Sequence, residues 1–109
     1  MILNFLTKYY FYFFLIVGSI LLAEDGSPNQ KELAIHHFMQ GEFLLNQGNY
    51  ALAVIEFQDA LDIDPNASTI HISIADAYRR LGRSKHAVNH LRIAIDLDPD
   101  DLSSREMLG

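Results

Sequence analysis

The sequence contains no cysteine. This absence excludes disulfide bonds, thiolate metal sites and a cysteine nucleophile, so the fold must be held together by packing alone. Basic residues are also few, with 8 lysines and arginines against 14 aspartates and glutamates in 109 residues, a formal charge of −6. A chain of this sign repels phosphate backbones, and general nucleic-acid binding is therefore disfavoured.

Sequence motifs of common catalytic sites are missing as well. There is no glycine-rich phosphate loop, and no serine lies in the context of a nucleophile elbow. Two acidic pairs, Asp62 with Asp64 and Asp96 with Asp98, each stand beside a proline, and the second pair repeats the first. This repetition is typical of a structural pattern rather than of catalytic carboxylates. We therefore expect a protein that is not an enzyme and has no cofactor.

Charged residues are absent from one long apolar stretch, YYFYFFLIVGSILLA at 9–23. Lys8 precedes it and acidic residues follow it, a polarity that carries the rest of the chain out of the cytoplasm. As a helix the stretch is about 22 Å long, against roughly 30 Å of membrane hydrocarbon, which favours a signal peptide cleaved after Ala23. The alternative is an uncleaved anchor, in which Ile2, Leu3, Phe5 and Leu6 also enter the membrane and Lys8 snorkels. Either segment predicts an exported protein.

The rest of the chain repeats itself at an interval of 34 residues, since NYALAVIEFQDALDIDPN at 49–66 returns as RSKHAVNHLRIAIDLDPD at 83–100. Apolar residues recur in both copies with the 3.6-residue spacing of an amphipathic helix. Helices are predicted at about 29–47, 50–63, 67–81 and 84–97. Glycines that tolerate left-handed geometry end the first and third, and prolines end the second and fourth. Ser27 is expected to cap the first helix, with Pro28 at its first position.

Small residues recur where the two helices of such a hairpin face each other. They are Ala53, Ala60, Ala87 and Ala94. Because helices approach closely only where one presents little side chain, Gly41 and Ala75 are expected to make the opposing contacts. Larger residues would then fill the space between hairpins, namely Leu44, Phe57, Tyr78 and Leu91.

These spaced residues resemble the tetratricopeptide repeat (TPR) family, which has a period of 34 residues. The residues that carry the resemblance are Gly41, Leu44, Gly48, Tyr50, Ala53, Phe57, Ala60 and Pro65, then Ile74, Ala75, Tyr78, Gly82, Ala87, Leu91, Ala94 and Pro99. The resemblance implies an all-α fold of tandem helix-turn-helix hairpins, a fragment of a right-handed α-solenoid. The implied divisions are a signal peptide or anchor at 1–23, a linker and helix start at 24–33, repeats at 34–67 and 68–101, and a partial third repeat or capping helix at 102–109.

The resemblance also implies that a protein or peptide binds the concave surface, which the first helix of each hairpin lines. The corresponding groove residues are Ile35, Phe38, Met39, Glu42, Leu45, Asn46, Thr69, Ile72, Ser73, Asp76, Arg79 and Arg80. The residues of this set that come from the first repeat, Ile35 to Asn46, form a first row. This row is unusually apolar for an exposed surface, which favours an interface. Alternatively, residues 24–33 fold back over Phe38 and Met39 and make them part of the core.

Two arginines in this set have two alternative explanations. Arg79 and Arg80 lie near a helix C-terminus, where the helix dipole stabilises a cation by about 0.3–1 kcal/mol. The functional alternative is that one of them receives a carboxylate from a bound peptide.

Histidines suggest a metal site only weakly. His86 and His90 are spaced to share an ion on one helix face, but no third ligand is near them in sequence, so no metal site is predicted. His37 and His71 stand where the family more usually has Trp, Tyr or Leu, and a pH-responsive interface through either is a further hypothesis.

Taken together, these features predict an exported TPR adaptor or assembly factor, in the periplasm or attached to the outer face of the cytoplasmic membrane. Its partner would be a protein segment, with membrane contact only through residues 1–23 if they are uncleaved. Because two repeats bury few of their apolar faces, the alternatives are a membrane-tethered, homo-oligomerising scaffold or the N-terminal fragment of a longer TPR array.

Overall fold

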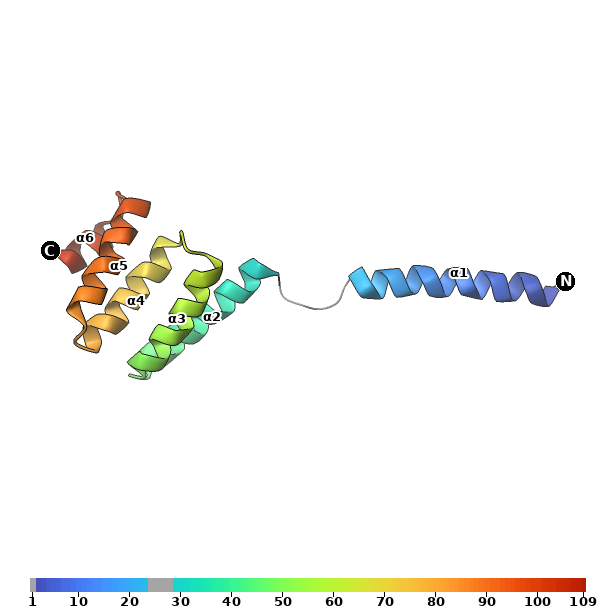
Figure 1. The fold of residues 1–109 in the computed structure, drawn as a ribbon, viewed down its shortest axis with the longest axis horizontal. Helices are drawn as coiled ribbons and strands as arrows, with labels where there is room; N and C mark the ends of the chain where they lie inside the picture. The colour runs from blue at the N-terminus through green and yellow to red at the C-terminus, as the bar shows by residue number, and fades with distance from the viewer. Residues whose placement is uncertain (1, 24–28) are drawn as a thin grey trace.

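A computed structural model describes residues 2–23 and 29–109, and every regular element in these ranges is an α-helix (Figure 1). The helices are α1 (Ile2–Ala23), α2 (Gln30–Asn46), α3 (Tyr50–Ile63), α4 (Ser68–Arg80), α5 (Ser84–Leu97) and α6 (Leu102–Leu108). Helices α2 to α5 agree with the predicted helices to within one residue at each end. The all-α prediction is therefore confirmed.

The helices from α2 onward pack as two consecutive hairpins. Helix α2 pairs with α3, α4 pairs with α5, and the hairpins stack through α3 and α4 (Figure 1). Each hairpin turns at a glycine with positive φ, 80° at Gly48 and 75° at Gly82, a conformation that disfavours other residues. The tandem-hairpin architecture is thus confirmed.

Helix α2 begins later than its predicted cap. Its N-cap is Asn29, whose side-chain oxygen accepts a hydrogen bond of 2.8 Å from the backbone N–H of Glu32. This bond satisfies one of the free N–H groups of the first turn, so Asn29, and not Ser27, is the cap. Ser27 and Pro28 lie outside the described residues.

The first hairpin closes around a glycine and a phenylalanine. Phe57 of α3 is fully buried, and a Cβ added to Gly41 of α2 would lie 2.5 Å from its Cε1 atom. Helices α2 and α3 approach this closely because residue 41 has no side chain. Ala53 and Ala60, both fully buried, flank Phe57 on α3. The predicted close contact at Gly41 is confirmed.

A second, smaller core lies inside the second hairpin. It consists of Ala75, Ala87 and Leu91, and Tyr78 packs against both this core and the first one. Helix α6 packs on α5 and adds Met107 to this core. The last apolar face of the second hairpin is therefore partly covered by the end of the chain.

Helix α1 contains the predicted export segment. It extends from Ile2 to Ala23, so the apolar stretch and the residues before it lie on one helix. The described aromatic side chains at 9–14 are all exposed, from 58% at Tyr12 to 79% at Phe14. Among the described residues, no helix combines the length and the apolar character required to cross a membrane.

Candidate functional site

A cavity of about 370 Å³ lies between the first helices of the two hairpins. Its lining residues are Glu42, Leu45, Ile72, Ser73, Asp76, Arg79 and Met107. All but Met107 belong to the predicted groove, so the structure brings half of that set together around one hollow. Sequence reasoning missed Met107 because its position depends on how α6 packs, which no repeat position specifies.

The floor of this cavity is joined across the two hairpins. The Ser73 hydroxyl of α4 donates a hydrogen bond to the Glu42 carboxylate of α2. Leu45 beside them is half-buried and packs against the first core. The floor is therefore held by both hairpins, and its shape depends on their stacking.

One carboxylate serves both arginines at the rim. Asp76 Oδ1 lies 2.6 Å from Arg79 Nη2, and Asp76 Oδ2 lies 3.3 Å from Arg80 Nε. Two guanidinium groups thus share one carboxylate, which leaves one positive charge uncompensated within the group. Arg79 remains 62% exposed in its side chain and lines the cavity, so it is free to bind a further carboxylate.

Arg80 has a different place from its neighbour. Its guanidinium carbon lies 5.6 Å from the centre of the Tyr50 ring, in cation–π geometry, and its Nη1 lies 3.5 Å from the Tyr50 hydroxyl. Arg80 therefore links the second hairpin to the first, and it does not line the cavity.

A second hollow of about 190 Å³ lies at the other end of the groove. Its lining residues are Lys31, Ala34, Ile35, Phe38, Asp64, Ala67, Thr69 and Ile70. Of the remaining predicted groove residues, Met39 and Asn46 are exposed and, like Arg80, line neither hollow.

The apolar first row divides between groove and core. Ile35 and Met39 are 47% and 65% exposed, whereas Phe38 is half-buried with its ring 5.9 Å from that of Phe57. The alternative of a chain segment folded back over this row is wrong for residues 29–33, because they form the cap and first turn of α2. Residues 24–28 lie outside the described part of the chain.

The second hairpin holds a pair of hydrogen-bonded histidines. His71 is 5% exposed, its Nε2 donates to the Pro65 carbonyl at 2.8 Å, and its Nδ1 lies 3.0 Å from Nδ1 of His90. With the Nε2 proton used in this way, neutral His71 accepts at Nδ1 from His90. Burial and then the charges of His71 and His86 lower the pKa of His90. Both helix-spaced histidines also lie against the ring of Tyr78, with ring centres 5.0 Å away for His86 and 5.7 Å away for His90, but only His90 is hydrogen-bonded to His71.

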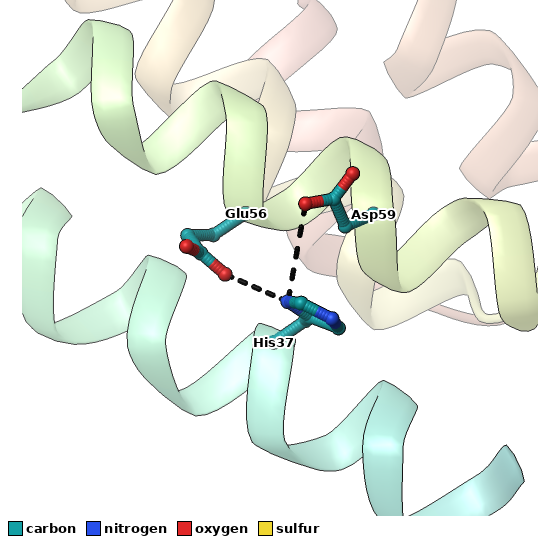
Figure 2. A group of neighbouring side chains, drawn as sticks. All are labelled: His37, Glu56 and Asp59. Carbon is teal, nitrogen blue, oxygen red and sulfur yellow. Dashed lines mark hydrogen bonds and ion pairs between the residues drawn. The ribbon is translucent and has the colours of Figure 1, made fainter.

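Sequence reasoning missed one polar cluster in the first hairpin. His37 of α2 lies opposite Glu56 and Asp59 of α3, and its Nδ1 points between the two carboxylates (Figure 2). The sequence signal was the 19-residue separation that also relates His71 to His90. That separation places residues 37 and 56 opposite each other in the hairpin.

The hairpins share one period and stack on each other, and a hollow lies on the side of their first helices. This architecture defines a helical-repeat protein with a recognition surface. Comparison with known sequences agrees, since models of the tetratricopeptide repeat match residues 21–68 and 68–101. The chain belongs to the TPR family, and its repeats form a protein–protein interaction module.

Two curated proteins are similar to this chain. Superkiller protein 3 of Schizosaccharomyces pombe is 34% identical over 79 residues, which cover 72% of this chain and 6% of the relative. Protein O-mannosyl-transferase F38B6.6 of Caenorhabditis elegans is 25% identical over 81 residues, or 74% of this chain and 11% of the relative. The chain thus spans a small part of both relatives.

Proposed function

We propose that this protein is an exported, non-enzymatic adaptor or assembly factor that binds an extended segment of a partner protein in its groove. The observation that supports this proposal best is the 370 Å³ cavity, which is lined from α2, α4 and α6 and has Arg79 at its rim. Leu45 and Ile72 offer apolar contacts there, while Arg79 offers a guanidinium for a carboxylate. We therefore propose an apolar segment with an acidic residue or a free C-terminal carboxylate.

Binding is testable with an immobilised library of short peptides that vary in charge and carry free or amidated C-termini. We expect the full chain to prefer apolar peptides with a carboxylate, and Arg79→Glu to weaken the best of them at least tenfold, because an attraction becomes a repulsion. Arg92→Glu is the matched control, since Arg92 is exposed on α5 and lines neither hollow. Equal losses in both variants would contradict a role for this cavity.

Export is proposed from the charge pattern around residues 9–23. We expect the mature protein, purified from the cell envelope of its host, to begin at Glu24, which intact-mass measurement would detect. A mass that includes residues 1–23 in the membrane fraction would favour the uncleaved anchor. Recovery of the whole chain from the cytoplasm would contradict export.

A second candidate is the membrane-tethered, homo-oligomerising scaffold. It is favoured by the exposed Ile55 and Leu52 on α3, at 56% and 53%, which leave apolar surface on the first hairpin. Light scattering across a range of concentrations separates the candidates, because a constant monomeric mass is incompatible with the scaffold.

A further inference from the structure

The cluster of His37, Glu56 and Asp59 has a geometry that suits a metal ion. His37 Nδ1 lies 2.8 Å from Glu56 Oε2 and 4.0 Å from Asp59 Oδ2, and one ligand atom from each residue lies within 4.8 Å of the others (Figure 2). Two ligand atoms bound to one tetrahedral zinc ion at about 2.1 Å are about 3.4 Å apart. The two observed separations lie on either side of this value. Side-chain shifts of well under 1 Å would therefore bring His37 Nδ1 to this distance from each of the two carboxylate oxygens.

The backbone already places these ligands. Glu56 and Asp59 are three residues apart on α3, so their side chains emerge on one face of that helix. His37 faces them from α2, and the two helices are held together by the close contact between Gly41 and Phe57. The ligands thus come from two helices whose separation is set by the core. Binding of an ion would therefore cost little conformational entropy of the backbone.

The charges also favour a dication. Two carboxylates face a single imidazole, which can neutralise only one of them even when it is protonated. A bound Zn²⁺ with neutral His37 would balance both. The side chain of Asp59 is 49% exposed, compared with 24% for His37, so the site opens to water on the Asp59 side and a water molecule can complete the coordination.

The second hairpin provides an internal comparison. Positions 34 residues further along carry His71, His90 and Ile93, and there the two histidines are hydrogen-bonded to each other with no carboxylate among the three. Of the two hairpins, the first thus has the complete ligand set, although both pair their helices in the same order.

We propose that His37, Glu56 and Asp59 form a zinc-type metal site that fastens α2 to α3 in the first hairpin. The mixed nitrogen and oxygen ligands suit Zn²⁺ or a neighbouring transition ion better than Ca²⁺ or Mg²⁺, which prefer oxygen alone. None of the three residues lines either hollow of the groove, so the site is independent of the proposed peptide binding.

The direct test is a titration of the full chain with Zn²⁺, followed by calorimetry and by the melting temperature. We expect one ion per chain and a higher Tm, since an ion that binds only the folded state stabilises it. His37→Gln and Asp59→Asn should each weaken Zn²⁺ binding at least tenfold. Matched controls are His36→Gln, beside the site on α2, and Asp62→Asn, one turn further along α3, and both should bind as the wild type does.

Co²⁺ provides a second readout that does not depend on stability. A tetrahedral site with His37 should give intense visible absorption bands, and these should disappear in His37→Gln. The proposal is overturned if Zn²⁺ does not bind, or if binding survives both His37→Gln and Asp59→Asn. Loss of binding in His36→Gln together with retention in Asp59→Asn would also overturn it, because the ion would then be at the surface of α2.

Discussion

Replacing Gly41 with leucine is expected to lower the free energy of unfolding by about 3 kcal/mol. A single added Cβ already lies 2.5 Å from Phe57 Cε1, and the ring of Phe57 is fully buried. Helices α2 and α3 must then separate or the ring must leave its position. A small domain has a total stability of only about 5–15 kcal/mol, so this is a large fraction.

Alanine at the same position has two opposing effects on the free energy of unfolding. Alanine is the better helix former by about 1 kcal/mol, whereas overpacking a close contact costs about 1–3 kcal/mol. Because the nearest atoms belong to a rigid, buried ring, we expect the steric term to win and Gly41→Ala to be destabilising. Packing then requires glycine at this position, although glycine has a low helix propensity.

Urea unfolding monitored by far-UV circular dichroism measures these effects. Gln40→Leu is the control, since Gln40 is exposed beside Gly41 on α2, and its expected change is within about 0.5 kcal/mol. Gly41→Ala combined with Phe57→Leu should lose less stability than the sum of the single changes, because the smaller side chain makes room for the methyl group. A stable Gly41→Leu protein with the wild-type midpoint would contradict the packing argument.

Acidification is expected to destabilise the second hairpin through His90. Burial, followed by the charges of His71 and His86, lowers the pKa of His90 below its ordinary value of 6.5. The folded protein therefore binds fewer protons here than the unfolded chain, and stability is complete above pH 6.5 and declines as the pH falls through the folded pKa. His71 and Tyr78 on α4 and His86 on α5 are the titratable groups in contact with His90 or its charge.

The physical cost of that protonation is a positive charge in a partly buried place near His71 and His86. The hydrogen bond itself is kept, because a doubly protonated His90 still donates from Nδ1 to His71.

Unfolding midpoints between pH 7.5 and 5.0 give the measurement, and the difference between wild type and His90→Gln isolates this residue. Glutamine keeps a donor for His71 but does not titrate, so its stability profile should be flatter. His36→Gln, which changes an exposed histidine, should follow the wild type. Parallel profiles for wild type and His90→Gln would exclude His90 as the acid-sensitive group.

Helix existence and order could be predicted from the sequence because both are local. The prolines after α3 and α5 and the glycines after α2 and α4 end those helices wherever they pack, and the predicted bounds agree to within one residue. The 34-residue repetition then predicted the hairpins, since equal sequences bury equal faces. The cap of α2 was placed wrongly because Ser27 and Asn29 are both acceptable cap residues, and only the hydrogen bond from Glu32 N–H to Asn29 selects one.

The groove could be predicted only as a set of positions. Correspondence with the repeat pattern of the family identified the residues on the first helices. It could not show that Phe38 packs against Phe57 while Met39 stays exposed. Met107 was beyond reach for a different reason, because α6 is a short helix whose docking depends on the second core.

The amino-acid sequence by itself determined the helices, their pairing and the membership of a repeat family, because these follow from periodicity, glycine and proline. The tertiary structure alone decided which polar side chains meet between helices: Ser73 with Glu42, and His37 with two carboxylates. Such contacts join residues on different helices. They are set by distances of a few ångströms between packed elements, which a linear pattern does not encode.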